Sequence, residues 1–472
     1  MASSMDIDTA SGTGASAASS SEAAAYAFLD SLPLASYPSV LRPYFPRFKT
    51  LRSKKLWYQL TLSIEELIAL SESRLPEVKD AKGRQLLIGL YDDFVSAFGP
   101  SKLSPLRWVG IAVNVARQYP EPAQALAFLT DSVVAKTESG RRELEEDAEA
   151  KAKAKEGEAA AAAAKDGKEK EKEKEKAKDG ASSSQQQQQQ QQGQARDDDD
   201  AYVFATMEAA HFKLILGDLE GTKAAMTRSA RVLDTFDSVE HAVHAAYYRV
   251  SGDYYKAKAE YASYYKNSLL FLACVNIETD LGVEDRVQRA HDLSVSALLG
   301  DTIYNFGELL LHPILDSLND TPHAWLSDLL FAFNAGDLGR FEALLPHLSS
   351  RDPLLASQTQ FLRQKVCLMA LIESVFKRST DDRTLSFETI ALETRLPVDE
   401  VEHLVMKALS LNLIRGTLDQ HAQLARITWV QPRVLDRRQI EALQDRLNQW
   451  CTRVQSVAEF VKGQTPELFV TA

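Results

Sequence analysis

Apolar side chains recur at helical spacing along most of the chain. In the first half, three successive runs keep apolar residues three and four positions apart, which places each run on one face of a helix. The runs cover residues 57–68, 86–98 and 106–119, and a fourth helix is predicted from about residue 123. The pattern predicts N-terminal helical repeats over residues 25–140, preceded by a small, polar and disordered segment, residues 1–24.

The pattern stops in residues 141–200, a low-complexity segment rich in charged residues and glutamine. This segment contains one Leu and no Ile, Val or aromatic residue. It therefore cannot bury enough apolar area to offset the entropy of ordering, and an inserted loop or linker is expected. Two other interpretations stay open: a solvated single helix held by Glu/Lys pairs, and a glutamine-rich interaction tract.

The helical pattern resumes after this segment, over residues 201–380, and a Gly-Asp dipeptide recurs within it. Gly can end one helix in the left-handed conformation, and the following Asp can cap the next helix. Two of the three intervals are 35 and 36 residues, near the length of a helical hairpin repeat. The pattern predicts a helical-hairpin solenoid, with chance recurrence as the alternative. The dipeptides are Gly217-Asp218, Gly252-Asp253, Gly300-Asp301 and Gly336-Asp337.

The periodicity changes again over residues 381–432. A short strand is expected at 384–386, a short helix at 387–393 and a turn at Leu396-Pro397. A second helix follows, with apolar residues at i, i+3, i+4, i+7 and i+8 from Val401. Two period-two runs joined by the polar turn 419–423 then predict a β-hairpin. Strand, helix, helix and hairpin in this order are typical of a winged helix.

The second strand of this hairpin is a candidate interaction surface. Ala425, Ile427 and Trp429 alternate on one of its faces, and Ile414, Gly416 and Leu418 alternate on the strand before it. A strand at a sheet edge can be extended by main-chain hydrogen bonds from another protein. We therefore expect Ala425, Ile427 and Trp429 to mark a winged-helix edge used for assembly.

The last segment, residues 433–465, carries a regular apolar seam. Its spacing alternates between three and four without a miss, which suits a coiled coil or helical bundle. We expect a C-terminal assembly helix from about residue 436 to 462. The alternative is a final helix that packs on its own domain. The seam residues are Ile440, Leu443, Leu447, Trp450, Val454, Val457 and Val461.

Composition limits the class of protein. The net charge of −12 argues against a general polyanion-binding protein, because phosphate neutralisation needs a basic surface. Cys274, Cys367 and Cys451 are isolated, which is typical of a reducing compartment. Neither a secretory signal nor a run of apolar residues long enough to cross a membrane is found. A soluble protein of the cytoplasm and nucleus is expected, with no membrane partner.

No pattern for catalysis or for a cofactor is found. Phosphate-binding loops, dinucleotide fingerprints, nucleophile elbows and zinc-dependent deubiquitinase motifs are absent. His241 and His244, next to Glu240, could imitate a metal pair, but no third ligand follows at suitable spacing. Cys367 lies in an apolar helix and is expected to be a buried small residue. We expect no enzymatic activity, no metal or cofactor and no small-molecule ligand.

The winged helix raises the alternative of a nucleic-acid-binding protein. Its second helix carries Asp399, Glu400 and Glu402 against a single Lys407. Phosphates would repel such a helix as it entered a major groove. A winged helix without a basic face instead favours contacts with other proteins, and no nucleic-acid partner is expected.

Helical repeats that lead into a winged helix resemble the PCI-domain family. Several strings make the resemblance more specific to the non-ATPase subunits of the 26S proteasome lid, and within these to the family of non-ATPase subunit nine. It extends from about residue 50 to the end, with a PCI module at about 262–432. The strings are 54–62 (KKLWYQLTL), 264–266 (YYK) with Leu269, 304–309 (YNFGEL), 405–410 (VMKALS) and 428–435 (TWVQPRVL).

The resemblance implies a structural, non-catalytic subunit in ubiquitin-dependent protein degradation. It implies contacts with other lid subunits, made by pairing of winged helices and by a C-terminal helical bundle. It also implies a contact of the N-terminal repeats with the ubiquitin-receptor subunit. A PCI subunit of another assembly, such as the signalosome, is the alternative. The family does not usually carry an insertion like residues 141–200.

Overall fold

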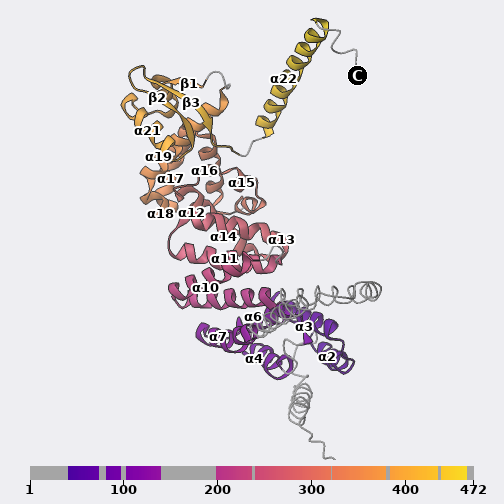
Figure 1. The fold of residues 1–472 in the computed structure, drawn as a ribbon. Coiled ribbons are helices and arrows are strands. Elements are labelled where there is room, and N and C mark those ends of the chain that lie inside the picture. Colours follow the sequence, from indigo (N-terminus) through magenta and orange to yellow (C-terminus); the bar gives the residue numbers. More distant parts are fainter. Residues whose placement is uncertain are drawn as a thin grey trace, which may run out of the picture. The chain divides into compact units, whose positions relative to one another are not determined.

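The structure, a computed structural model, is mainly helical, with one small sheet near the C-terminal end (Figure 1). This confirms the predicted fold class. The chain forms two compact units that divide near residue 257, and each is described by itself. The structure describes residues 41–73, 81–96, 102–139, 198–235, 240–319, 321–378, 383–433 and 437–464. The expectations for residues 1–24 and for most of the segment 141–200 fall outside these ranges.

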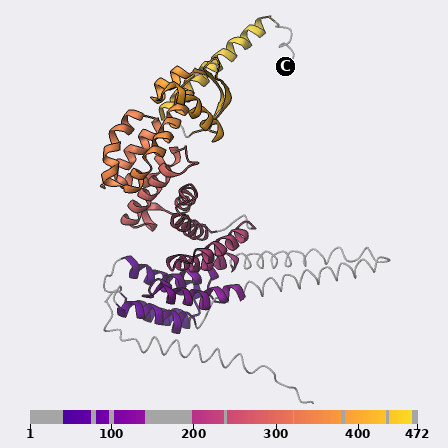
Figure 2. The same ribbon diagram turned by 90° about the vertical axis from the view of Figure 1, so that its left-hand side faces the viewer.

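The first unit contains the predicted N-terminal helices. Leu60, Ile64 and Leu67 of α3 are at most 1% exposed, so the apolar face predicted from their spacing is the buried one. Helices α2, α3, α6 and α7 pack side by side (Figure 2). Their bounds are α2 (Tyr44–Ser53), α3 (Trp57–Ser73), α4 (Ala81–Gly89), η3 (Leu90–Val95), α6 (Pro105–Ala116), α7 (Pro122–Phe128) and η4 (Leu129–Val134).

This unit also contains the helices 198–215, α10 (Leu219–Leu233) and α11 (His241–Ala257). Gly217, at the end of the first of these helices, has a φ of 86°. The Asp218 carboxylate then accepts a hydrogen bond from the Gly221 N–H at 2.9 Å. A left-handed Gly followed by a capping Asp is the predicted device, and it is confirmed here.

Solenoid helices of the second unit lead up to the winged helix. Helix α14 packs on η5 and α16, and α16 packs on α17 and α19. The aromatic rings of Phe306, Phe333 and Phe341 meet edge to face in the core. The elements are α12 (Tyr261–Cys274), α13 (Ile277–Asp280), α14 (Val283–Leu299), α15 (Gly307–Leu310), η5 (Pro313–Leu318), α16 (Ala324–Ala335), α17 (Leu338–Arg351), α18 (Pro353–Ser357) and α19 (Thr359–Lys377).

The Gly-Asp prediction is correct at Gly336-Asp337 and wrong at two other positions. Gly336 has a φ of 65°, and the Asp337 carboxylate caps α17 through two backbone N–H groups. In contrast, Gly252-Asp253 lies inside α11, which continues because it buries Val250 and Tyr254 on either side of the dipeptide. Gly300 ends α14 with an extended backbone, at a φ of −66°. The hairpins are therefore not marked at a constant interval.

The winged helix has the predicted order of elements. It consists of β1 (Thr384–Ser386), α20 (Phe387–Thr394), α21 (Val398–Ser410), β2 (Ile414–Asp419) and β3 (Leu424–Val430). The strand order is β1-β3-β2, with both pairs antiparallel. A bulge lies between Arg415 and Gly416. Only Gly fits there, because a Cβ at position 416 would lie 2.1 Å from the Arg426 carbonyl oxygen.

The strand order corrects the prediction that Ala425, Ile427 and Trp429 mark a sheet edge. They lie on β3, which is the central strand, because β1 pairs with its other side. Ala425 and Ile427 are 1% and 5% exposed, so they belong to the core. Trp429 is half-buried, beneath the Arg415 guanidinium 4.6 Å from the ring centre. The edges of this described sheet are β1 and β2.

Helix α22 (Arg437–Gln464) agrees with the predicted C-terminal helix. All seven seam side chains are exposed, from 42% at Val461 to 63% at Trp450. This differs sharply from the apolar residues of the winged helix and the solenoid, most of which are nearly inaccessible. In this structure the seam side chains of α22 are therefore not part of the core of the winged helix.

Candidate protein-interaction surfaces

The winged helix rests on α19, the last solenoid helix, which contacts α20, α21 and β3. One face of α19 buries an almost continuous apolar row, including Leu362, Val366 and Met369. Within this row Lys365 is only 1% exposed. A lysine inside an apolar face needs hydrogen-bond acceptors, because burial of an unpaired ammonium group is costly.

Those acceptors are the last carbonyl groups of α14. The Lys365 Nζ donates to the carbonyl oxygens of Ala297, Leu298 and Gly300 at 2.8, 3.0 and 2.7 Å. An ammonium group has three donors, so this set satisfies it fully. The end of a helix also carries unpaired carbonyls and partial negative charge. Lys365 thus caps α14 and ties it to α19.

Burial lowers the pKa of Lys365 to about 7, and the Asp301 carboxylate acts in the opposite direction. The amine lies in an aromatic enclosure, with the ring centres of Tyr304 and Phe306 at 5.4 and 5.3 Å. The Lys365 residue is only 1% exposed to solvent. Its role is therefore structural: it holds the solenoid helix on which the winged helix rests.

A second buried contact fixes the segment that leaves the winged helix. Arg433, three residues after β3, donates from Nη1 to the Glu373 carboxylate at 2.6 Å. Its Nη2 donates to the backbone carbonyl and side-chain oxygen of Asn334 at 2.7 and 2.8 Å. The Arg433 and Glu373 side chains are 9% and 11% exposed. We call these contacts of Arg433 with Glu373 and Asn334 the Arg433 clamp. It joins the segment that follows β3 to α16 and α19 through buried, charge-assisted hydrogen bonds.

Neither contact could be located from the sequence. The available signal was a charged residue, Lys365 or Glu373, in the middle of an apolar helical face. A charge in an apolar face shows that a hydrogen-bond or ion-pair partner is required, but it does not show which residue provides it. Arg433 falls within the string 428–435 that carries the family resemblance.

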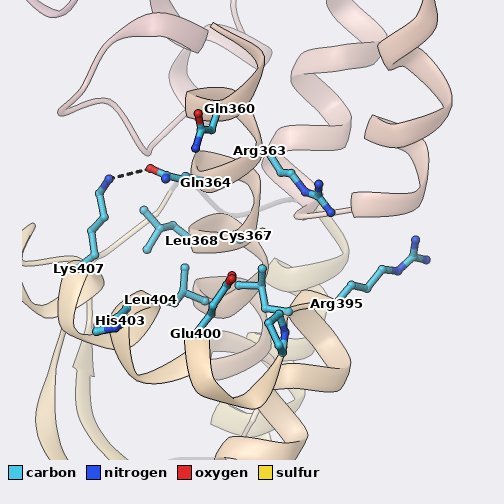
Figure 3. Close-up of a pocket in the computed structure, with 12 residues that line it drawn as sticks. Gln360, Arg363, Gln364, Cys367, Leu368, Arg395, Glu400, His403, Leu404 and Lys407 are labelled. Atoms are coloured by element: carbon cyan, nitrogen blue, oxygen red, sulfur yellow. Dashed lines mark hydrogen bonds between the residues drawn. The ribbon is translucent and has the colours of Figure 1, made fainter.

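An open groove of about 690 Å³ lies between α19 and α21. Figure 3 shows its two walls, with Lys407 of α21 reaching across to the Gln364 side chain of α19 at 3.1 Å. Leu368 and Leu404 form an apolar part of the lining. Cys367, 3% exposed, also lines it, and burial raises the pKa of this thiol, so it is not an activated nucleophile. Its predicted burial is confirmed.

The described residues contain no group of three or more side chains that could hold a metal ion. His241 and His244 both lie on α11, without a third ligand there. In the same parts of the chain, no helix is long and apolar enough to cross a membrane. The surfaces that stand out are thus the edges of the winged-helix sheet and the exposed seam of α22.

Comparison with known proteins agrees with this architecture. The profile of the PSD13 N-terminal repeats matches residues 44–182 and 158–330, and the PCI domain profile matches residues 346–429. The chain is therefore a PCI-domain protein built on helical repeats.

Individual relatives define the family further. The chain is 34% identical to the 26S proteasome regulatory subunit RPN9 of Saccharomyces cerevisiae over 445 residues, which cover 94% of this chain and 98% of the relative. It is 45% identical to the probable 26S proteasome regulatory subunit rpn9 of Schizosaccharomyces pombe over 271 residues, 57% of this chain and 70% of the relative. The 26S proteasome non-ATPase regulatory subunit 13 homolog B of Arabidopsis thaliana is 34% identical over 91% of this chain and 95% of its own length. The chain belongs to the Rpn9/PSD13 family of proteasome regulatory subunits.

Proposed function

We propose that this protein is a non-catalytic scaffold subunit of the 26S proteasome lid, which supports lid assembly and ubiquitin-dependent degradation in the cytoplasm and nucleus. Similarity to proteasome regulatory subunits over nearly the whole chain supports the assembly. The observation that carries the scaffold role is the exposed seam of α22. A row of large apolar side chains on a soluble protein marks a surface that another protein covers.

The seam is long enough for a stable contact. It extends over 22 residues from Ile440 to Val461, roughly 30 Å of helix. Burial of each large side chain contributes ~1.5–3 kcal/mol. A bundle with helices of other lid subunits would bury all seven, whereas the isolated chain leaves them in water.

A double substitution in the seam tests this role. Leu447→Asp with Trp450→Asp would place two carboxylates in the bundle interior, each costing several kcal/mol if buried without a partner. We expect the full-length variant to keep its helix content and thermal unfolding but not to co-purify with the lid. The matched control, Thr452→Asp with Ser456→Asp, adds the same charge to the opposite face of α22 and should assemble normally. Loss of cooperative unfolding in the seam variant would instead mean that α22 packs on its own domain.

The winged helix supplies a second proposed contact, at the edge strand β2. The Ile427 N–H donates a hydrogen bond to the Arg383 carbonyl, on the side of β3 that pairs with β1. Because successive residues of a strand direct their backbone N–H and C=O groups to opposite sides, the neighbouring Arg426 directs its groups towards β2. Thr417 pairs with Arg426, and the next residue, Leu418, directs its N–H away from the sheet. A neighbouring winged helix could bond to this edge.

Proline substitutions separate this edge from the internal ladder. Leu418→Pro removes the outward N–H, which an edge strand tolerates, and should weaken incorporation into the lid without unfolding the domain. Thr417→Pro removes an internal N–H and should unfold the sheet. Incorporation of Leu418→Pro at the wild-type level would rule out β2 as the pairing edge.

The N-terminal repeats are the proposed contact for the ubiquitin-receptor subunit, on the family resemblance alone. Co-purification with mass spectrometry distinguishes the alternatives for the whole protein. Recovery of lid subunits and proteasome ATPases supports the proposal, whereas recovery of signalosome subunits or of chromatin supports another PCI assembly or a nucleic-acid-binding protein. Turnover of a ubiquitin-linked or nucleotide substrate by the pure chain would contradict the non-catalytic role.

A further inference from the structure

The charges of α22 are segregated around its apolar seam. When the seam residues occupy positions a and d of a heptad, Arg446 and Arg453 both occupy position g, immediately beside the seam. The carboxylates Glu441, Asp445 and Glu459 occupy positions b and f, on the opposite side of the helix. The border of the seam is thus basic although the whole chain carries a net charge of −12.

Neither arginine can be neutralised within its own helix. A helical ion pair needs a carboxylate three or four residues away. Around Arg446 those positions hold Ala442, Leu443, Gln449 and Trp450, and around Arg453 they hold Gln449, Trp450, Ser456 and Val457. Among the described residues, no ion pair is formed by either guanidinium, and both residues are exposed.

The other border of the seam is uncharged from Gln444 onward, and the one charged residue at position e of α22 is Arg437, one turn before the first seam residue. Position e is occupied by Gln444, Cys451 and Ala458, and the last g position by Phe460, which is 68% exposed. Small side chains beside a seam allow a second helix to approach closely. The apolar surface is therefore wider in the C-terminal half of α22 than a two-stranded seam requires.

We propose that the partner of α22 is a helix of another lid subunit that carries two carboxylates, about one heptad apart, opposite Arg446 and Arg453. Seven residues of helix correspond to about 10 Å, so the two carboxylates would lie at positions separated by the same distance. Charged residues at g and e positions determine partner choice and orientation, while the apolar seam provides most of the affinity. This inference rests on the proposed bundle and specifies the chemistry of the partner.

A second copy of this chain does not meet that requirement. In a parallel pair, position g faces position e of the partner, where Cys451 and Ala458 offer no carboxylate. In an antiparallel pair, g faces g, and the arginines of the two copies would repel each other. The pattern therefore favours a different chain over self-association.

The test measures binding of the full-length chain to purified lid that lacks it. Arg446→Glu with Arg453→Glu should weaken binding roughly tenfold or more, because attraction becomes like-charge repulsion. The conservative variant Arg446→Lys with Arg453→Lys should retain most of the affinity and the salt dependence. Arg438→Glu with Lys462→Glu changes the net charge equally at positions f and b, away from the seam, and should bind like the wild type.

Salt dependence gives an independent readout. Wild-type binding should weaken as ionic strength rises, and binding of the charge-reversed variant should not, because its attractive pairs are gone. The charge-reversed variant could bind as tightly as wild type while Leu447→Asp with Trp450→Asp does not bind. That result would support the proposed helical bundle and refute the proposal that the partner helix is acidic. If the seam variant also binds normally, the proposed function itself fails. Equal weakening of the charge-reversed variant and its outer-face control would also refute the inference.

Discussion

The Arg433 clamp yields the most quantitative prediction about the PCI region. Arg433→Leu removes three hydrogen bonds of 2.6–2.8 Å and leaves the Glu373 carboxylate buried beside α16. Among the described residues, the ion-pair partner that remains to Glu373 is Lys377, at 3.7 Å and 70% exposed. Removing one member of a buried pair costs about 3–5 kcal/mol, since the remaining charge stays desolvated. We expect Arg433→Leu to lower the free energy of unfolding by about 3 kcal/mol.

The matched control is an arginine whose ion pair is exposed. Arg395 pairs with Glu342 at 3.1 Å, but the two side chains are 57% and 44% exposed. Exposed pairs contribute about 0.2–1 kcal/mol, so Arg395→Leu should have little effect. Both substitutions remove the same charge and leave an apolar side chain of the same size.

Chemical and thermal unfolding of the full-length chain measure the difference. At about 2–4 °C per kcal/mol for a unit of roughly 200 residues, Arg433→Leu should lower the Tm of the second unit by about 6–12 °C. Adding Glu373→Leu should restore much of the loss, because a buried pair replaced by apolar side chains is often neutral. Equal stability of Arg433→Leu and Arg395→Leu, or no recovery in the double variant, would falsify the clamp as described.

Three other positions give further predictions. Lys365→Met should lower the free energy of unfolding by about 3 kcal/mol or more, because three buried carbonyls lose their donor. Urea titration measures this loss, with Lys407→Met, at an exposed lysine, as the control. Gly336→Ala should cost at least about 2 kcal/mol, since φ is 65° and the new Cβ would lie 2.6 Å from a Cα atom of α19; an unchanged urea midpoint would contradict this. Burial lowers the pKa of His312, whose Nδ1 accepts the Ile314 N–H at 3.3 Å. Its contribution should be present above pH 6.5 and be lost as the pH falls through its lowered folded pKa, and His312→Asn, which keeps an acceptor, should lose less stability between pH 7 and 5.

Local patterns determined most elements of this protein. The winged-helix strands and helices were predictable because each combines a clear period with turn residues, as at Leu396-Pro397. The seam of α22 was predictable as a surface because seven positions keep one heptad register. Gly336-Asp337 was predictable because a left-handed Gly and a capping Asp act within a few residues.

Other features depended on contacts between distant residues. Period-two alternation is the same in an edge strand and a central strand, so only the pairing of Leu385 with Ala425 shows that β3 is enclosed. Gly252-Asp253 carries the same local signal as Gly336-Asp337, but α11 continues through it because Val250 and Tyr254 are buried on both sides.

The buried charges show the same limit most clearly. Lys365 meets the end of α14 across 65–68 residues of chain, and Arg433 meets Glu373 and Asn334 across 60 and 99 residues. The sequence by itself determined that these charges lie in apolar surroundings and need partners. Only the tertiary structure decided which partners they have, because a hydrogen bond depends on positions in space that no local periodicity encodes.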